Sequence, residues 1–352
     1  MRILVTGSDG YIGSLLGPHL AAQGHDVVGL DAGFYRVGWL YNPGTPEIPT
    51  LTRDIRELKQ ADLESFGAVV HMAELSNDPL GQLAPTITHE INHQGSVQLA
   101  EAAKAAGVER FVYTSSCSVY GDAEQDLVDE ESPLRPQTAY AICKERVELD
   151  VANFAADDFS PTFLRNATAY GASPRMRFDI VLNNLCGLAW TIREIRMESD
   201  GTPWRPLVHI LDICKAIARV LEAPREVVHN QILNVGDRDA NYQIREVAEI
   251  VGRVFPGCEV TVGVRGGDLR SYRVSFAKIH ELLPDFECDW DVELGARQLL
   301  EVFSAVDLTE EEFRSRFFTR LKQVEYLLRT GQIDASFFWR PLELVPRDAE
   351  LV

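Results

Sequence analysis

The amino-acid sequence predicts an α/β fold, in which a doubly wound parallel sheet carries a smaller mixed lobe. From residue 2 to about residue 165, short β-branched runs alternate with longer amphipathic stretches, which is the pattern of repeated βαβ units. After residue 170 the alternation decays into mixed segments. We therefore expect a main domain over residues 1–170, a lobe over residues 171–300 that returns some segments to the main sheet, and a helical extension over residues 301–352.

Each element of the main domain has its own sequence pattern. Expected strands occupy residues 3–6, 26–30, 51–53, 68–72, 111–114 and 162–164, and expected helices occupy residues 11–23, 90–106 and 138–153. In the lobe we expect helices at 179–190, 211–221 and 245–254 and a strand at 232–235. An amphipathic stretch, 310–330, and aromatic residues at 337–339 are expected to dock on the domain or on a partner subunit.

The composition is that of an ordinary globular protein, with 45% hydrophobic and 25% charged residues. The 34 basic and 53 acidic side chains give a net charge of −19 (34 − 53), and a field of that sign repels nucleic acid and anionic membranes. Six cysteines lie singly, without zinc-site spacing, and the sequence shows no secretory leader or membrane-spanning run. We expect no metal, no nucleic-acid or membrane partner, and a reduced, cytoplasmic setting.

A glycine-rich turn follows the first expected strand and opens the first expected helix. Its residues include Gly7, Gly10, Tyr11, Ile12 and Gly13. Such a turn lets backbone approach a pyrophosphate closely, and the helix N-terminus offers it free N–H groups. Asp31 ends the second expected strand, 18 residues after Gly13, where a carboxylate can accept the hydroxyls of an adenosine ribose. Because a 2′-phosphate would meet like charge there, the pattern predicts a Rossmann-type domain that binds NAD in preference to NADP.

Tyr140 and Lys144 lie four residues apart in an expected helix, and therefore on the same face. A phenol of ordinary pKa about 10 is a poor base at neutral pH, and a nearby ammonium lowers that pKa by stabilising the phenolate. A tyrosine adjusted in this way can take a proton from a sugar hydroxyl while hydride leaves the same carbon for a nicotinamide. The spacing alone is equally typical of an exposed pair of helix residues. The catalytic interpretation therefore depends on the strand that precedes this helix in the sequence.

The expected strand 111–114 runs into a cluster of hydroxyls, Thr114-Ser115-Ser116-Cys117-Ser118, at a strand end where an open α/β sheet presents its chemistry. With the glycine turn and the Tyr140–Lys144 pair in this order, the chain resembles the extended short-chain dehydrogenase/reductase superfamily of nucleotide-sugar epimerases and dehydratases. The resemblance covers roughly residues 1–290. It implies that Ser116 hydrogen-bonds the reacting sugar hydroxyl, that Tyr140 is the base and that Lys144 is its partner, both also contacting NAD.

The resemblance implies a further wall of cofactor contacts. These are Asp54 and Ile55, beside adenine, and Met72, Ala73 and Glu74, beside the pyrophosphate and ribose. Glu74 departs from the family, which usually has an alanine at this position. Asn92 matches an asparagine that braces the central strands, so we expect it to be structural rather than catalytic.

The second half of the chain resembles the family's nucleotide-sugar-binding lobe. Implied substrate contacts are Ser76, Ser116, Cys117, Ser118, Asn166, Arg205, Arg265 and Arg270. Asn166 matches an asparagine that holds the diphosphate, and Arg205 and Arg265 match arginines that clamp it, which suits bidentate guanidinium groups. Cys117 is one position out of register with the family's catalytic cysteine, which reverses the face of its side chain, so packing is the stronger interpretation.

The residues after Ser116 narrow the reaction that the resemblance implies. Family dehydratases have Asp-Glu directly after the Ser or Thr, whereas this chain has Cys117 and Ser118. A decarboxylase glutamate and a 3,5-epimerase cysteine would both stand at Ser118. A site without these groups suits hydride removal, rotation of the ketose and hydride return, so we expect a C4 epimerase. A reductase or dehydrogenase of 4-keto sugar nucleotides, and a catalytically inert NAD-binding regulator, stay open.

The resemblance also implies a homodimer, formed through the expected helices 90–106 and 138–153. Leu99, Ala103 and Ala106 fall on one helical stripe whose alanines allow close helix approach. The same stripe would serve equally well inside the chain's own core.

Overall fold

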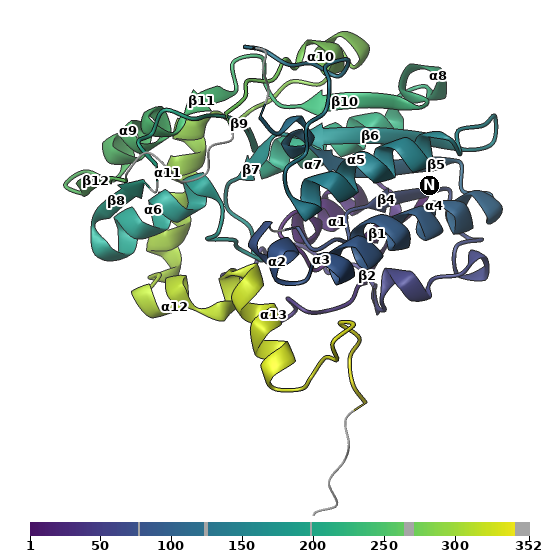
Figure 1. Cartoon of the computed structure of the whole chain (residues 1–352), viewed down its shortest axis with the longest axis horizontal. Coiled ribbons are helices and arrows are strands. Elements are labelled where there is room, and N and C mark those ends of the chain that lie inside the picture. Colours follow the sequence, from purple (N-terminus) through teal and green to yellow (C-terminus); the bar gives the residue numbers. More distant parts are fainter. Residues whose placement is uncertain (77, 123–125, 198, 264–270, 342–352) are drawn as a thin grey trace, which may run out of the picture.

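Seven parallel strands form the central sheet of the computed structural model, which describes residues 1–76, 78–122, 126–197, 199–263 and 271–341 (Figure 1). The strand bounds are β1 Arg2–Thr6, β2 Asp26–Asp31, β3 Thr50–Thr52, β4 Ala68–His71, β5 Arg110–Ser116, β6 Ser160–Asn166 and β10 Gln231–Val235. Their order across the sheet is β10-β6-β5-β4-β1-β2-β3. The order reverses between β1 and β4, as in a doubly wound sheet, and the predicted fold class is confirmed.

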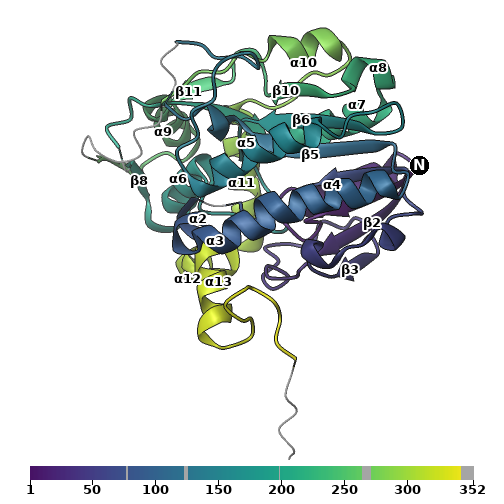
Figure 2. The ribbon, with the colours of Figure 1, turned by 45° about the vertical axis from the view of Figure 1, so that its right-hand side comes forward.

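Helices cover both faces of this sheet (Figure 2). Those that lie on it are α1 (Gly13–Ala22), α7 (Ile210–Glu222), α4 (Ser96–Ala105) and α5 (Ala139–Ala152). Successive side chains of β1 alternate between two cores, because Ile3 and Val5 pack on the side of α1 and α7, whereas Leu4 packs on the side of α4 and α5. All three side chains are buried, so both faces of the sheet are apolar.

The smaller lobe lies beside the main sheet and holds two short sheets (Figure 1). One contains β7 (Thr168–Tyr170), β9 (Trp204–His209) and β11 (Asn241–Gln243), and the other β8 (Glu194–Met197) and β12 (Glu259–Val262). Its main helices are α6 (Val181–Ile192), α9 (Ile244–Val254) and α11 (Val292–Val306), which crosses residue 300. Their buried side chains form a third apolar cluster, and β10, from the range expected for the lobe, pairs with β6 in the main sheet.

The expected helix over residues 90–106 is continuous but changes pitch along its length. A π-helical turn, η3 (His89–Gly95), leads directly into α4. Leu99 and Ala103 on α4 are fully buried within the chain's own apolar core. Of the two alternatives for this stripe, the structure therefore shows the internal core for Leu99 and Ala103.

The amphipathic stretch over residues 310–330 does not form one continuous helix. The segment contains α12 (Glu310–Arg314), the 3₁₀ turn η5 (Arg316–Phe318) and α13 (Arg320–Arg329). Ser315 and Thr319 have extended backbone angles that interrupt the helical path. The interruption lets Phe313 and Phe318 both pack on Phe178, with ring centroids 4.8 and 5.6 Å away. Aromatic packing against the lobe therefore overrides helix propensity.

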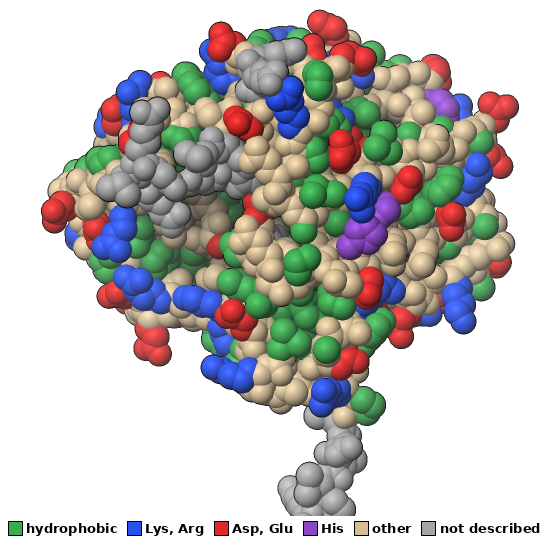
Figure 3. Space-filling view, in the orientation of Figure 1, with side chains coloured by type: hydrophobic (Ala, Val, Ile, Leu, Met, Phe, Trp, Pro, Cys, Tyr) green, Lys and Arg blue, Asp and Glu red, His purple; other side chains and the backbone are tan. Residues whose placement is uncertain are grey.

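Short helices complete the described chain. They are α2 (Asp78–Leu83), α3 (Pro85–Thr88), α8 (Arg225–Val228), α10 (Ala277–Leu282), η1 (Ile55–Glu57), η2 (Gln60–Asp62) and η4 (Cys117–Tyr120). In the part of the chain that the structure describes, no helix combines the length and apolar character needed to cross a bilayer. All six cysteines are free thiols. On the face shown in Figure 3, acidic side chains are spread among basic ones.

A buried ion pair connects α5 to the neighbouring strands β5 and β6. The ends of these strands lead to the cavity described below. Arg165 on β6 contacts Glu148 on α5 at 2.7 Å, and each side chain is 3% exposed. Ser115 on β5 donates a hydrogen bond to the same carboxylate, and Arg165 also donates to the Tyr120 hydroxyl at 3.0 Å. Each charge is thus partnered, which is the condition under which burial of two charges is tolerated. The pair holds the ends of β5 and β6 against α5.

Removing one partner of this pair should destabilise the fold. Arg165→Met leaves the Glu148 carboxylate buried without its cation, and the expected loss in the free energy of unfolding is about 3–5 kcal/mol. Urea denaturation followed by circular dichroism measures this loss. The double variant Arg165→Met, Glu148→Leu removes both charges and should recover most of the stability. A single variant as stable as the wild type would contradict the assignment.

Candidate active site

A cavity of about 1030 Å³ runs along the carboxyl ends of the central strands, between the main sheet and the lobe. Open α/β sheets bind ligands at this position. The predicted site residues that line it are Gly7, Gly10, Tyr11, Ile12, Gly13, Asp31, Asp54, Ile55, Met72, Ala73, Glu74, Ser76, Ser116, Ser118, Tyr140, Lys144, Asn166 and Arg205. The fold therefore brings residues 198 positions apart in the chain (205 − 7) to one cavity.

The glycine turn is too tight for side chains at two of its positions. Gly7 has a φ of +74°, and a Cβ on it would lie 2.9 Å from the backbone nitrogen of Ala73. A Cβ on Gly13 would lie 2.2 Å from the carbonyl oxygen of Gly7. The turn thus presents bare backbone to the cavity at the start of α1, where helix N–H groups favour an anion. This shape fits the pyrophosphate of a dinucleotide.

Asp31 lies at the end of β2, on the wall of the same cavity. Its two carboxylate oxygens accept hydrogen bonds from the backbone N–H groups of Asp9, at 3.1 Å, and Gly33, at 2.7 Å. Burial and the neighbouring Asp9 carboxylate raise the pKa of Asp31 to about 6, against the opposing effect of those N–H groups. The carboxylate is held in a fixed direction, and its remaining lone pairs fit the hydroxyls of a ribose.

Hydrogen bonds within the chain fix the residues that are expected to line the cofactor, both beside adenine and beside the pyrophosphate and ribose. The Asp54 carboxylate accepts the backbone N–H of Arg56 at 2.8 Å and pairs with its guanidinium at 2.7 Å. The backbone N–H groups of Met72 and Ala73 donate to the Thr6 hydroxyl at 3.1 and 3.2 Å. Asp54 therefore shapes the wall as a partnered charge.

Tyr11 and Asn92, which the sequence analysis identified, hold parts of the cavity wall in place through hydrogen bonds. The Tyr11 hydroxyl donates to the carbonyl oxygen of Gly171 at 2.6 Å and accepts a hydrogen bond from Asn183 at 3.0 Å, which ties the glycine turn to the lobe. The Asn92 side chain accepts from the backbone N–H of Leu75 at 2.8 Å and donates to its carbonyl oxygen at 3.1 Å. Asn92 thus holds the loop after β4, in keeping with the structural role expected for it.

The end of β5 brings Ser116 to the cavity. Its hydroxyl accepts the backbone N–H of Ser118 at 3.1 Å and caps η4. The Ser118 hydroxyl and the Asn166 amide oxygen are buried in the cavity wall without a hydrogen-bond partner among the described residues. Because buried polar atoms are normally hydrogen-bonded, these two atoms are suited to a polar ligand.

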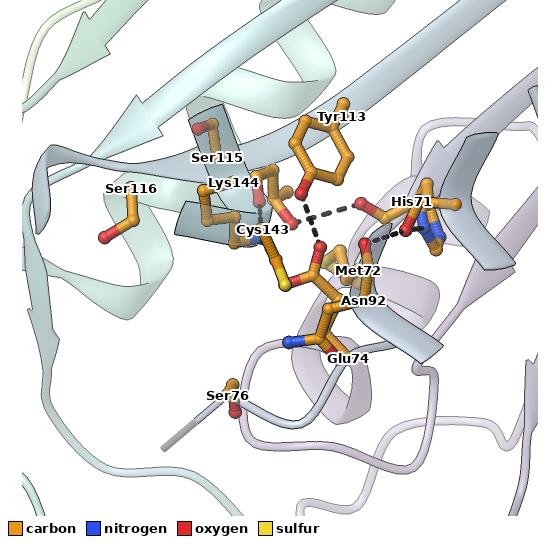
Figure 4. Close-up of polar contacts among 12 residues, drawn as sticks. His71, Met72, Glu74, Ser76, Asn92, Tyr113, Ser115, Ser116, Cys143 and Lys144 are labelled. Atoms are coloured by element: carbon orange, nitrogen blue, oxygen red, sulfur yellow. Dashed lines mark hydrogen bonds and ion pairs between the residues drawn. The ribbon is translucent and has the colours of Figure 1, made fainter. Parts of the chain in front are cut away.

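Lys144 is buried near the ends of β4 and β5, and Figure 4 shows its surroundings. Its ammonium donates to the carbonyl oxygen of Thr114 and pairs with Glu74 at 2.7 Å, the two side chains being 3% and 1% exposed. Tyr113 donates its hydroxyl to the same carboxylate at 2.5 Å. Burial raises the pKa of the Glu74 carboxyl, and Lys144 and Tyr113 act against that rise. The position expected to hold an alanine thus holds a partnered charge.

Tyr140 lies one helical turn before Lys144, whose ammonium is 5.4 Å from the centre of the phenol ring. The expected lowering of the Tyr140 pKa is wrong for this arrangement. Burial raises that pKa well above its ordinary value, the carboxylates of Glu74 and Asp78 raise it further, and groups that lower it offset only part of the rise. Glu74, the partner of Lys144, is therefore one of the groups that oppose ionisation of the phenol.

One of the expected substrate contacts, Cys117, lies outside the cavity. Cys117 is 1% exposed, donates its thiol to the carbonyl oxygen of Arg165 at 3.2 Å and packs in the core outside the cavity. Its assignment as a substrate contact is wrong, because the backbone one residue beyond Ser116 turns the side chain inward. Arg265 and Arg270 lie outside the described residues.

The cavity also contains charged residues that the sequence analysis missed. Asp78 begins α2, and Arg177 pairs with Asp179 at 2.9 Å and donates to Ser76 at 3.3 Å. An aspartate just before proline at a helix start is a pattern that could have singled out Asp78. Arg320 is remote in sequence and reaches the cavity only through the packing of α13.

Comparisons with known proteins agree with this geometry. The model of the "NAD dependent epimerase/dehydratase family" matches residues 3–236. The UDP-glucose 4-epimerase of Corynebacterium glutamicum is 29% identical over 276 residues, which are 72% of this chain and 80% of that protein.

Solved structures are similar over most of the chain. TunA, an NAD-dependent NDP-hexosamine 5,6-dehydratase involved in tunicamycin biosynthesis, superposes with a TM-score of 0.77 and 26% identity, covering 87% of this chain and 99% of TunA. MoeE5, in complex with UDP-glucuronic acid and NAD, superposes with a TM-score of 0.75 and 27% identity, with the same coverage. The relatives include both epimerases and dehydratases. The chain therefore belongs to the NAD dependent epimerase/dehydratase family, and NAD is its cofactor.

Proposed function

We propose that the protein is a nucleotide-sugar epimerase that inverts C4 of its substrate through a 4-keto intermediate. The observation that carries the proposal is the make-up of one cavity wall, which Ser116, Tyr140 and Lys144 line together. The residues that follow Ser116 are Cys117 and Ser118, which provide no carboxylate for loss of water. Glu74, a carboxylate on the same wall, is paired with Lys144. The wall thus suits proton exchange at a single hydroxyl.

In this mechanism the side chains of the wall remove one proton from the substrate and later return it. Bound NAD supplies the acceptor and afterwards the donor of the hydride. The Tyr140 phenolate takes the proton of the sugar 4-hydroxyl and returns it to the 4-oxygen after the ketose has turned, while Ser116 hydrogen-bonds that oxygen. Asn166 and Arg205 hold the diphosphate during the rotation. Proton and hydride both return, so a cycle consumes no co-substrate.

A sugar-nucleotide dehydratase is the second candidate, and one observation favours it. Asp78 lines the same cavity, and its charge acts on Tyr140. A carboxylate there can remove a proton from the ketose, as elimination of water requires. TunA, one of the similar structures, is a dehydratase.

Product analysis tests the reaction type. The purified enzyme is incubated with UDP-, dTDP-, GDP- and CDP-hexoses without added reductant, and the products are separated by chromatography. We expect interconversion of one pair of C4 stereoisomers without accumulation of NADH. Free sugars should not react, because contacts to the diphosphate supply the binding energy that positions the ring. A deoxy-keto product, or a keto sugar formed with stoichiometric NADH, would contradict the proposal.

Replacement of the proposed base should abolish most of the turnover. Tyr140→Phe is expected to lower kcat about 10²–10⁴-fold with fold and NAD affinity retained, because only the proton-accepting oxygen is lost. Ser116→Ala removes one hydrogen bond to the reacting oxygen and should cost less, about tenfold to a hundredfold. Steady-state kinetics and circular dichroism measure both. Near-native turnover of Tyr140→Phe would mean that another group is the base.

The pairing of Glu74 with Lys144 predicts a specific pH dependence. Activity is expected to rise as Tyr140 loses its proton. The ascending limb of a plot of kcat/KM against pH therefore reports the Tyr140 pKa. Glu74→Gln removes a charge that raises this pKa and leaves the Lys144 ammonium free to lower it. The limb should therefore move to lower pH, by about one to three units.

A matched control separates this effect from a change in net charge. Glu101→Gln alters the charge by the same amount at an exposed position on α4, outside the cavity, and should leave the profile in place. If Glu74→Gln also leaves the limb in place, Glu74 does not act on Tyr140.

We further propose that the enzyme is a homodimer in a reduced, cytoplasmic setting. Six free thiols support the setting. The resemblance to dimeric family members supports assembly through α4 and α5, and Leu149 on α5, which is 61% exposed, offers an apolar contact on the outer face of that helix.

A further inference from the structure

The C-terminal segment, residues 310–341, packs against the loop that follows Asp31 (Figures 1 and 2). Gln323 on α13 donates a side-chain N–H to the carbonyl oxygen of Phe34 at 2.9 Å. Trp339 donates its indole N–H to the carbonyl oxygen of Ala32 at 2.5 Å. The segment therefore braces the strand end that carries the carboxylate expected to bind ribose.

Arg320, the first residue of α13, brings a guanidinium to the cavity. It is 3% exposed and lines the cavity together with Asp31 and the glycine turn. Its guanidinium carbon lies 4.2 Å from the centre of the Tyr35 ring. Among the described residues, no carboxylate lies within ion-pairing distance of this guanidinium, and no acceptor hydrogen-bonds to it. Because an arginine this deeply buried is normally paired, the side chain is suited to an anionic ligand.

Other guanidinium groups lie near Arg320. Arg177 is paired with Asp179, whereas Arg175 is 3% exposed and has Nε and Nη1 atoms without a hydrogen-bond partner among the described residues. Burial lowers the pKa of Arg175 and of Arg320 to about 10, and a neighbouring arginine adds to the lowering in each case. Cations that repel one another in this way are stabilised by an anion placed among them.

The surroundings of Arg320 indicate which part of the cofactor it meets. Its charge interacts with that of Asp31, which is expected to bind the adenosine ribose, and with Asp179 and the Tyr35 phenol. Asp31 suits ribose hydroxyls, whereas the planar fork of a guanidinium matches the oxygens of a phosphate.

We propose that Arg320 is a cofactor-binding residue, contributed by the C-terminal segment, that binds the pyrophosphate of NAD. The glycine turn and Asp31 bind the cofactor from the main domain, so α13 closes over its adenosine half and slows its exchange. Retention of this kind suits an enzyme that returns hydride to its own substrate, and to that extent the inference rests on the proposed function.

Calorimetric titration of the cofactor-free protein tests the inference, with NAD, ADP-ribose and adenosine as ligands. Arg320→Met should raise the Kd of NAD and of ADP-ribose about tenfold to a hundredfold, and change that of adenosine less than about twofold, because adenosine lacks the pyrophosphate. Arg329→Met, at the exposed last residue of α13, should leave all three values unchanged. If Arg320→Met fails to fold, Arg320→Lys keeps the charge without the fork and should show the same ligand ranking with smaller changes.

Two results would overturn the inference. One is an unchanged Kd for NAD in a folded variant. The other is an equal weakening of adenosine, which would mean that the substitution displaces the loop rather than removing a phosphate contact. The titration involves no sugar nucleotide, so a protein that binds NAD through Arg320 but inverts no sugar would refute only the proposed function.

Discussion

The Lys144 ammonium is buried where three parts of the chain meet, and the geometry of the candidate site depends on satisfying it. A carbonyl oxygen at the end of β5, the Glu74 carboxylate after β4 and the body of α5 must all keep their places. A buried charge without these partners would cost several kcal/mol, so the three elements are held in a fixed relation. Tyr140, one turn away on α5, is positioned by the same requirement, as is the Ser116 end of β5.

The surroundings of this pair also affect the pKa of the base. From spacing alone, Lys144 is expected to lower the pKa of Tyr140, yet in the folded chain burial raises that pKa, and Glu74 and Asp78 raise it further. Spacing along a helix predicts which side chains share a face. It says nothing about the burial of the phenol or about a carboxylate from the loop after β4, and these two together raise the pKa.

The fold was largely predictable because its signals are local. Apart from β3, the strands of the main sheet are largely buried on both faces and therefore have the pattern of short apolar runs, and the expected bounds differ from the observed ones by at most two residues. The glycine turn and the Tyr140–Lys144 pair were also visible, since their chemistry requires fixed spacing. The break at Ser315 and the arrival of Arg320 in the cavity depend on contacts between distant segments, which no local pattern records.

One part of the cavity is lined by the residues expected to bind the dinucleotide, and another by the groups expected to exchange protons. The C-terminal segment packs beside the end expected to bind adenosine. The proposed mechanism requires that hydride leaves C4 and returns to it without leaving this cavity. Mass spectrometry of the product formed from a sugar nucleotide with deuterium at C4 measures whether it does so. We expect the inverted product to keep its deuterium at C4 even when unlabelled NADH is present in solution. Loss of the label to the cofactor pool or to water would contradict it.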